Sequence, residues 1–479
     1  MAHDGAAVPL LESSVKPGKP KQRNMYAFLY ATLASMTTIF MGYNLALMSG
    51  AQLFIREDLG LSDAQIEVLA GSINVFMLAS ILAAGWAADH LGRRSTLVLA
   101  NAFLTAGALA MSLGGSYAAL VAARFVTGVG SGFSVVVTSV YNAEISPASM
   151  RGFLSSFLDM FISIGLLLSY VSNYAFSGMP VHLSWRVMYA AGVLPPLFLA
   201  AGVVLAMPES PRWLAMRGRE ADARAVLVRT SDTPAEADLR LEEIKQAVKE
   251  TKLGDNGDDA SVWKELLVHP SASVRRVLVC VVGVHFFQQA SGIDAIVLYS
   301  PLIFKQAGMS STAAVLGATV AVGVVKASFV LVATLLSDRL GRRPLLLAST
   351  AGAAAAMASL GATLCVGTKS TATMAACVSS VMAFMAAFSV GFGPVAGTYS
   401  AEIMPLRLRA QGTSLGNAVN RVTCGVVSMT FISLADWITM PGCFFLYAGV
   451  AAIAFVFVYR RFPETKGRSL EDMDVLFAK

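Results

Sequence analysis

Charged residues are scarce in this chain of 479 residues. Aspartate, glutamate, lysine and arginine make up 14% of the sequence, against 56% hydrophobic residues, and the mean hydropathy is +0.64. Soluble globular proteins carry about a quarter charged residues. This shortage of charge excludes an ordinary soluble domain and indicates an α-helical membrane protein that crosses the bilayer many times.

Cysteine and the usual marks of enzyme chemistry are scarce as well. The five cysteines lie inside apolar runs or at the start of one, and no pair has the spacing of metal ligands. The sequence therefore predicts no disulfide framework and no metal site. It shows no nucleophile–base pair and no nucleotide-binding loop, so we expect neither an enzyme nor a cofactor. A cleavable signal peptide is not expected either, because the first 24 residues are polar and basic.

Long apolar runs dominate what is present. A membrane-spanning helix needs roughly 20 mainly apolar residues, and about twelve such segments fit between Tyr26 and Tyr459. A charged segment with helical spacing interrupts them after the sixth. The predicted organisation is a tail, a six-helix bundle, a helical linker, a second six-helix bundle and a short tail, over residues 1–24, 25–207, 208–273, 274–459 and 460–479.

The second half of the chain repeats motifs of the first. DHLGRR at 89–94 returns as DRLGRR at 338–343, and YNAEISPASMRG at 141–152 returns as YSAEIMPLRLRA at 399–410. A third pair, PESPRWL and PETKGRSL, ends the two halves. One unit of six spans is therefore duplicated in parallel. An even number of spans places both termini on one side, and the arginine-rich loops share that side, which the positive-inside rule predicts to be cytoplasmic.

One apolar run in the second half contains several polar groups. Its sequence QQASGIDAIVLYSP carries two adjacent amides, a carboxylate and a phenol: Gln288, Gln289, Asp294 and Tyr299. Polar groups inside a bilayer are costly unless they face a cavity or a partner. Gly292 and Pro301 favour a bend or an unwound backbone here. A broken, polar segment of this kind indicates a substrate site, although the amides could also bind only neighbouring helices.

Taken together, these motifs resemble the major facilitator superfamily, and within it the sugar porter family. The resemblance is carried by the two DxxGRR loops, by the PESPR and PETKGR marks, and by the amide pair with GID and Tyr299 in the seventh helix. The segments FFQQASGIDA and AVNRVT look most like those of plant polyol and monosaccharide transporters. The resemblance implies an all-α fold of twelve transmembrane helices in two six-helix repeats, which transports a monosaccharide or polyol by alternating access.

The resemblance also implies roles for residues of the pocket. It assigns sugar contacts to Gln288, Gln289 and Asp294, and it makes Tyr299 a gating tyrosine beside the pocket. Amides and hydroxyls that both donate and accept hydrogen bonds suit a neutral polyhydroxy ligand. Asn420 is a further candidate contact, for which a bond to a neighbouring helix is an equal alternative.

Two other positions depart from the pattern of hexose porters. Leu166 stands where many of them have Gln, and Gly397 where many have Trp. Losing a large ring widens a pocket and removes a stacking face. The two departures are therefore consistent with a pocket that accepts a linear or larger polyol, and equally with an altered specificity or a poorly active paralogue.

A third departure, at Asn44, concerns proton coupling. In proton-coupled relatives this position of the GYDxGxxSG motif is Asp, which carries the proton opposite an arginine, here Arg124, whereas uniporting relatives have Asn. Asn cannot exchange a proton, so coupling has been lost or another intramembrane acid has replaced the Asp. Asp159 in the fifth span and Asp294 in the pocket are the candidates, and Lys326 is a possible partner of the latter.

The charged loops are predicted to form a cytoplasmic gate. Its candidate members are Asp89, Arg93, Arg94, Glu144 and Arg151 in the first half, and Asp338, Arg342, Arg343, Glu402 and Arg409 in the second. Salt bridges among them would hold the two halves together when the inside is shut. The alternative is that these charges only set the topology.

The expected partners follow from this assignment. They are a small sugar or polyol, the lipid bilayer and, where coupling persists, protons; no nucleic acid is expected. We expect a monomer in the plasma membrane, in preference to the vacuolar membrane, with both termini cytoplasmic. A membrane sugar sensor with little or no transport is the alternative, and the short tail from Arg460 argues against it.

Overall fold

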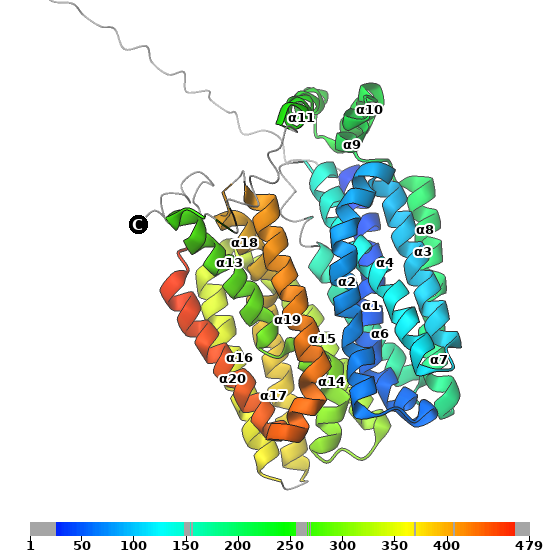
Figure 1. The fold of residues 1–479 in the computed structure, drawn as a ribbon, viewed down its shortest axis with the longest axis vertical. Helices are drawn as coiled ribbons and strands as arrows, with labels where there is room; N and C mark the ends of the chain where they lie inside the picture. The colour runs from blue at the N-terminus through cyan, green and yellow to red at the C-terminus, as the bar shows by residue number, and fades with distance from the viewer. Residues whose placement is uncertain are drawn as a thin grey trace, which may run out of the picture.

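The protein is an all-α bundle in the part of the chain that the structure describes. The computed structural model describes residues 25–147, 154, 157–254, 266, 268, 270–367, 370–405 and 408–464. Within these residues no strand occurs, and twelve helical spans are long and apolar enough to cross a bilayer. They form two bundles that stand side by side, the N half (α1 to α8) and the C half (α13 to α20) (Figure 1). The expected two-bundle architecture is confirmed.

The N half contains six spans, the last of which is interrupted. Its helices are α1 (Met25–Leu59), α2 (Asp63–Leu91), α3 (Arg93–Leu113), α4 (Tyr117–Ile145), α6 (Phe157–Phe176), α7 (Val181–Ala191) and α8 (Leu194–Ala206). Helices α7 and α8 together make the sixth span. Two prolines stand in the first turn of α8, where the missing amide N–H costs least, so the interruption before them is expected.

The C half has two interrupted spans. Its helices are α13 (Ala272–Ala290), α14 (Ile293–Gln306), α15 (Thr312–Leu340), α16 (Arg342–Cys365), α17 (Thr371–Val390), α18 (Phe392–Ile403), α19 (Arg409–Ile438) and α20 (Met440–Arg461). Between α13 and α14, Gly292 has a φ of 87°, a left-handed conformation that favours glycine. A Cβ there would lie 2.7 Å from the ring of Tyr447. The predicted break at Gly292 is confirmed, whereas Pro301 lies inside α14.

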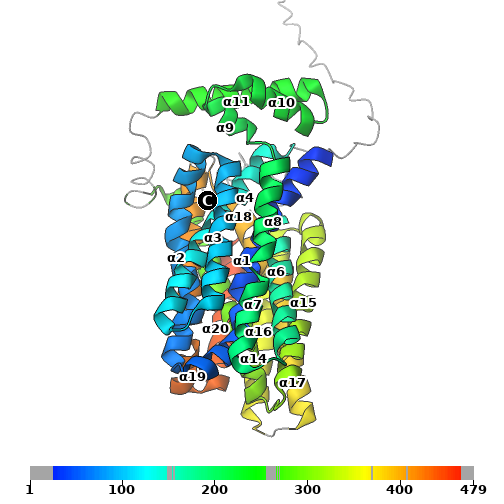
Figure 2. The same ribbon diagram turned by 90° about the vertical axis from the view of Figure 1, so that its right-hand side faces the viewer.

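The described part of the linker between the two halves contains α9 (Pro211–Met216), α10 (Glu220–Thr230) and the longer α11 (Pro234–Gly254). They lie across one end of the N half (Figure 2), which we call the linker end, and the opposite end is the far end. The Arg240 guanidinium donates to the carbonyls of Glu144 (3.3 Å) and Ser146 (3.1 Å), where α4 ends. A cation at a helix C-terminus binds otherwise unpaired carbonyls and complements the helix dipole.

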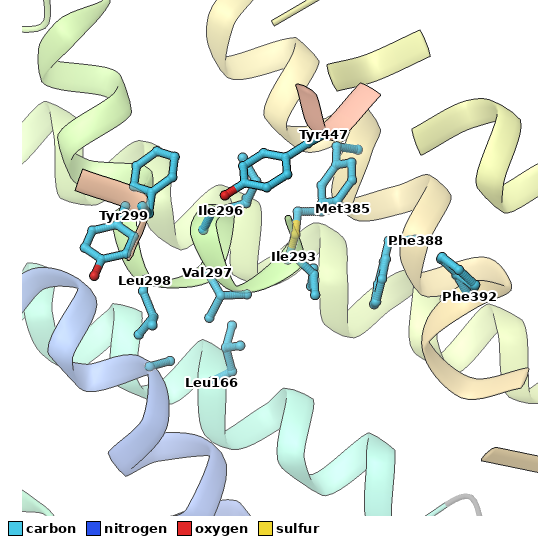
Figure 3. Packing of buried hydrophobic residues seen from close by; sticks show 14 of the residues in the cluster. Leu166, Ile293, Ile296, Val297, Leu298, Tyr299, Met385, Phe388, Phe392 and Tyr447 are labelled. Atoms are coloured by element: carbon cyan, nitrogen blue, oxygen red, sulfur yellow. The ribbon is translucent and has the colours of Figure 1, made fainter. Parts of the chain in front are cut away.

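The two halves pack through three pairs of helices: α2 with α19, α6 with α15, and α1 with α14. Small residues let these helices approach closely: a Cβ on Gly71 of α2 would lie 2.2 Å from the Met429 Cγ of α19. One apolar cluster runs through the C half and joins the N half. Figure 3 shows this cluster around Val297 and Leu298 of α14, with Leu166 of α6 beside them.

Candidate functional site

A cavity of about 160 Å³ lies between the two halves. Its polar lining residues are Asp159, Ser163, Gln288, Gln289, Asp294, Lys326, Ser389, Arg421 and Cys424. Apolar walls are added by side chains such as Met41 and Leu45 of α1 and Phe388 of α17. The lining comes from α1 and α6 of the N half and from α13, α14, α15, α17, α18 and α19 of the C half. A ligand in this cavity would therefore touch both halves.

The two adjacent amides are held in a fixed network on the C-half wall. Gln288 donates from Nε2 to the carbonyls of Phe392 (2.9 Å) and Gly393 (2.8 Å). Its Oε1 accepts from Asn420 Nδ2 at 2.7 Å, and Gln289 Nε2 donates to Asn420 Oδ1 at 3.2 Å. The structure thus brings together three of the predicted substrate residues. Gln288 and Gln289 line the cavity, while Asn420 stands behind them and orients both amides.

Four charged side chains also line the cavity: Asp159 of α6, Asp294 of α14, Lys326 of α15 and Arg421 of α19. Lys326 lies close enough to both carboxylates to interact with them electrostatically. Asp294 Oδ2 also accepts a hydrogen bond from the Cys424 thiol at 2.6 Å. The lining thus contains two acidic and two basic side chains, so neither sign predominates and the cavity suits a neutral ligand.

Sequence reasoning did not identify Arg421 as a site residue. It lies within the span from Gln411 to Ile438 and follows Asn420 directly. An ionisable residue inside an apolar span is a functional candidate by default. That rule drew attention to Arg124, and applied equally to α19 it would have found Arg421.

Asn44 and Arg124 lie together but away from the cavity lining. Both are buried, and the Arg124 Nη1 donates to the backbone carbonyl of Asn44 at 3.0 Å. The Asn44 Nδ2 donates within its own helix to the Phe40 carbonyl at 2.9 Å. The Nε and Nη2 of Arg124 are buried and meet no acceptor among the described residues. The arginine therefore hydrogen-bonds to the backbone carbonyl at position 44, and the Asn44 side-chain oxygen accepts no hydrogen bond from the described residues.

Tyr299 is fully buried on α14 and does not line the cavity. Its hydroxyl donates to the Ser428 carbonyl of α19 at 2.6 Å, and its ring stacks on Phe431 with centroids 5.0 Å apart. Figure 3 shows Tyr299 in the apolar cluster beside Leu298. The structure thus places the predicted gating tyrosine at a contact between α14 and α19.

The charged motifs at the linker end make ion pairs within each half. Arg93 donates from Nε and Nη2 to both oxygens of Glu144, at 3.0 Å each, and from Nη1 to Asp89 at 2.9 Å. In the C half Arg342 pairs with Glu402 at 2.9 Å. Each of these pairs joins two helices of the same bundle. Arg151 lies outside the described residues, as do the side chains of Asp338 and Arg409.

The PES and PET motifs cap the helices that follow the DxxGRR loops. Glu209 accepts from the backbone amides of Arg93 (2.8 Å) and Arg94 (3.2 Å) at the start of α3. Glu464 repeats this arrangement for Arg342 (3.0 Å) and Arg343 (3.1 Å) at the start of α16. Burial raises the pKa of Glu209, and the backbone amides bound to it act in the opposite direction. A carboxylate at a helix N-terminus is stabilising, so the duplicated motifs build the same cap twice.

The second arginine of each loop anchors a neighbouring helix. The Arg94 guanidinium donates to the Val204 carbonyl of α8, and Arg343 Nη2 donates to the Tyr459 carbonyl of α20 at 2.8 Å. Each arginine therefore bonds to the last helix of its own bundle.

Comparison with known proteins supports the family resemblance that the sequence motifs indicate. The family described as "Sugar (and other) transporter" matches residues 30–477. "Polyol transporter 5" of Arabidopsis thaliana is 51% identical over 480 residues, which cover 97% of this chain and 88% of that protein. "Putative polyol transporter 1" of the same plant is 50% identical over 471 residues, covering 95% and 92%.

Solved structures share the fold. The xylose transporter XylE from E. coli, in a partially occluded inward-open conformation, superposes with a TM-score of 0.79 at 24% identity, covering 93% of this chain and all of that one. The proton:xylose symporter XylE bound to 6-bromo-6-deoxy-D-glucose gives a TM-score of 0.78 at 25% identity, covering 95% and 100%. The relatives named here are transporters and not enzymes. The chain therefore belongs to the sugar porter family of the major facilitator superfamily and is similar to the plant polyol transporters.

Proposed function

We propose that this protein moves a neutral monosaccharide or polyol across a membrane by alternating access. The observation that carries the proposal is the cavity between the halves, with Gln288 and Gln289 fixed on its wall. Amide groups both donate and accept hydrogen bonds, which matches a chain of hydroxyl groups. The names of the plant relatives support a polyol as the substrate.

The orientation in the membrane follows from the charges of the linker end. Its arginine-rich loops are those that the positive-inside rule places in the cytoplasm. We therefore assign the linker end to the cytoplasm, together with both termini, and we take the plasma membrane as the membrane occupied. The far end then faces outside.

The contacts between the halves support an inward-facing state. At the far end, side chains of α1, α2 and α6 are hydrogen-bonded to the backbone of α14 and α19. At the linker end, Arg93 and Arg342 pair within their own halves. We propose that the predicted cytoplasmic gate forms when these charges exchange partners between the halves as the inside closes.

Facilitative transport is the mode that position 44 supports. Arg124 meets a backbone carbonyl there, where a proton-carrying carboxylate would be needed. Proton symport would have to use an acid of the cavity. Asp159 and Asp294 stand on opposite halves with Lys326 near both, so protonation of either would alter an electrostatic contact in the cavity.

Uptake into liposomes tests the proposal. The purified protein is reconstituted, and radiolabelled sorbitol and glucose uptake is measured with and without an inward proton gradient, against protein-free liposomes. Equilibration without accumulation would establish facilitative transport. Accumulation that collapses with a protonophore would assign coupling to a residue other than Asn44. Sugar binding without any uptake would refute transport and favour a sensor.

A further inference from the structure

Pro301 leaves one backbone carbonyl of α14 without a donor from its own helix. In an α-helix the amide of residue 301 would donate to the carbonyl of residue 297, but proline has no N–H. The Val297 carbonyl is nevertheless paired, because the Tyr170 hydroxyl of α6 donates to it at 2.7 Å. Tyr170 belongs to the N half, and both residues are buried. A missing bond within one half is therefore replaced by a bond from the other.

Two more N-half side chains bind C-half backbone groups at the far end. Gln52 of α1 donates from Nε2 to the next carbonyl of α14, that of Leu298, at 2.8 Å. Glu67 of α2 is buried and accepts on Oε1 from the amides of Ile432 (2.5 Å) and Ser433 (2.9 Å) of α19. The Ser433 hydroxyl donates to the other Glu67 oxygen. None of Tyr170, Gln52 and Glu67 lines the cavity.

These contacts are linked to one another through α19. In an α-helix the amide of Ile432 pairs with the carbonyl of Ser428, four residues earlier. In α19 each of these two groups also has a partner outside the helix. Glu67 binds the amide and Tyr299 of α14 binds the carbonyl. The N half therefore contacts α14 directly through Tyr170 and Gln52, and indirectly through Glu67 and α19. Asp294, on the cavity wall, lies one turn before Val297 on the same helix.

We propose that Tyr170, Gln52 and Glu67 form an outer latch that holds the two halves together at the far end. Its central acceptor is the Val297 carbonyl, which has no donor within its own helix because of Pro301. The proposal rests on the proposed function, in which the far end faces outside and opens during transport. Opening separates each side chain from its backbone partner, so the latch favours the outward-closed state. It also holds α14, and with it Asp294, in position against the cavity. The three side chains are thus positioning residues for transport.

A double-mutant cycle between Tyr170 and Pro301 tests the latch. Met429 packs on Gly71 where the halves meet. A cysteine introduced at Met429 should therefore become accessible when the far end opens, and its labelling rate with a membrane-impermeant maleimide measures that opening. The exposed Cys365 is replaced by serine in this background. Tyr170→Phe should raise the labelling rate about two- to tenfold, the loss expected for one hydrogen bond. In Pro301→Ala the new amide can serve Val297, so adding Tyr170→Phe should change little. An equal effect of Tyr170→Phe in both backgrounds, or no effect in either, would overturn the proposal.

Glu67 supplies a second test that does not depend on folding of the proline variant. Glu67→Gln keeps an oxygen for the two amides, so its labelling rate should stay near that of the parent. Glu67→Ala should raise it about tenfold, because the buried Ile432 amide and the Ser433 amide both lose their outside acceptor. Equal labelling of the two variants would contradict the latch. Labelling does not require transport, so a labelling response without sugar uptake would retain the latch and refute the proposed function.

Discussion

The linker end and the far end of the molecule are built in different ways. At the linker end the contacts lie within each half, and the two halves repeat them: Glu209 and Glu464 cap equivalent helices, and Arg93 and Arg342 pair with equivalent glutamates. At the far end, besides contacts within the N half such as that of Arg186 with Asp58, described hydrogen bonds cross between the halves. They join N-half side chains to C-half groups, most of which are backbone groups. Duplication of one six-helix unit explains the first set, because a copied sequence copies its internal contacts. The second set is not repeated in this way, because its side chains come from the N half and their partners from the C half, so it reflects divergence of the two copies.

The cavity shows the same divergence. The fixed amides belong to the C half, and among the described residues the N half contributes to the polar lining only Asp159 and Ser163. The C half therefore holds most of the groups that can bind a ligand, while the N half closes the cavity and, at the far end, bonds to α14 and α19. The predictions below test this division.

The largest effect is expected for Gln288→Ala, which removes a cavity amide and the partner of Asn420. Buried groups left unpaired cost about 1–3 kcal/mol, so sugar uptake should fall by about 100-fold while the protein still reaches the membrane. The matched N-half control is Ser163→Ala, whose hydroxyl bonds within its own helix to the Asp159 carbonyl. Unchanged uptake by Gln288→Ala would refute the C-half binding wall.

Asn44→Asp should place a proton-exchanging group at position 44 of the N half. The new carboxylate would lie in the helix whose backbone Arg124 already contacts, and an acid beside a buried arginine can carry a proton. Uptake should then rise about tenfold with an inward proton gradient. Asn44→Gln is the control, because it has no proton to exchange. If uptake by the Asn44→Asp protein does not change with the proton gradient, an acid at position 44 beside Arg124 is not sufficient for proton coupling.

Removal of the duplicated caps should cost similar amounts in the two halves. Glu209→Ala and Glu464→Ala each leave two backbone amides at a helix start without a carboxylate, and loss of a cap costs about 1–2 kcal/mol. Thermal unfolding in detergent should therefore shift by similar amounts for both. A shift in only one of the two variants would show that the two caps, although alike in geometry, stabilise their halves by different amounts.

The smallest effect is expected for Gly397→Trp on α18. A Cβ at Gly397 would meet no atom within 4 Å, and Gly393 and Pro394, one turn earlier on α18, line the cavity. By adding an aromatic face near the cavity, the substitution should strengthen hexose binding by about 1 kcal/mol, several-fold in KM, relative to linear polyols. The ratio of the two KM values measures this, and a ratio equal to that of the parent would place Gly397 outside the specificity determinants.

The sequence predicted the features that local pattern determines. Apolar length predicted the spans, Gly292 together with Pro301 predicted the break, and polar groups in an apolar run predicted Gln288 and Gln289. It paired charges between the halves because the repeated motifs matched, whereas in this state Arg93 and Arg342 bind within their halves. Contacts such as that of Tyr170 with a distant backbone carbonyl leave no pattern in either segment, so only the structure could show them.

The attachment of α9 to α11 has a consequence for following transport. Arg240 binds the end of α4, and the Trp213 indole donates to the Asp89 carbonyl at 2.9 Å, so the linker helices are fastened to the N half. When the two halves rotate relative to each other during transport, these helices should move with the N half as one rigid body. A fluorophore on α11 and a second on α16 would then record each cycle as a change in energy transfer, without a label in the path of the sugar.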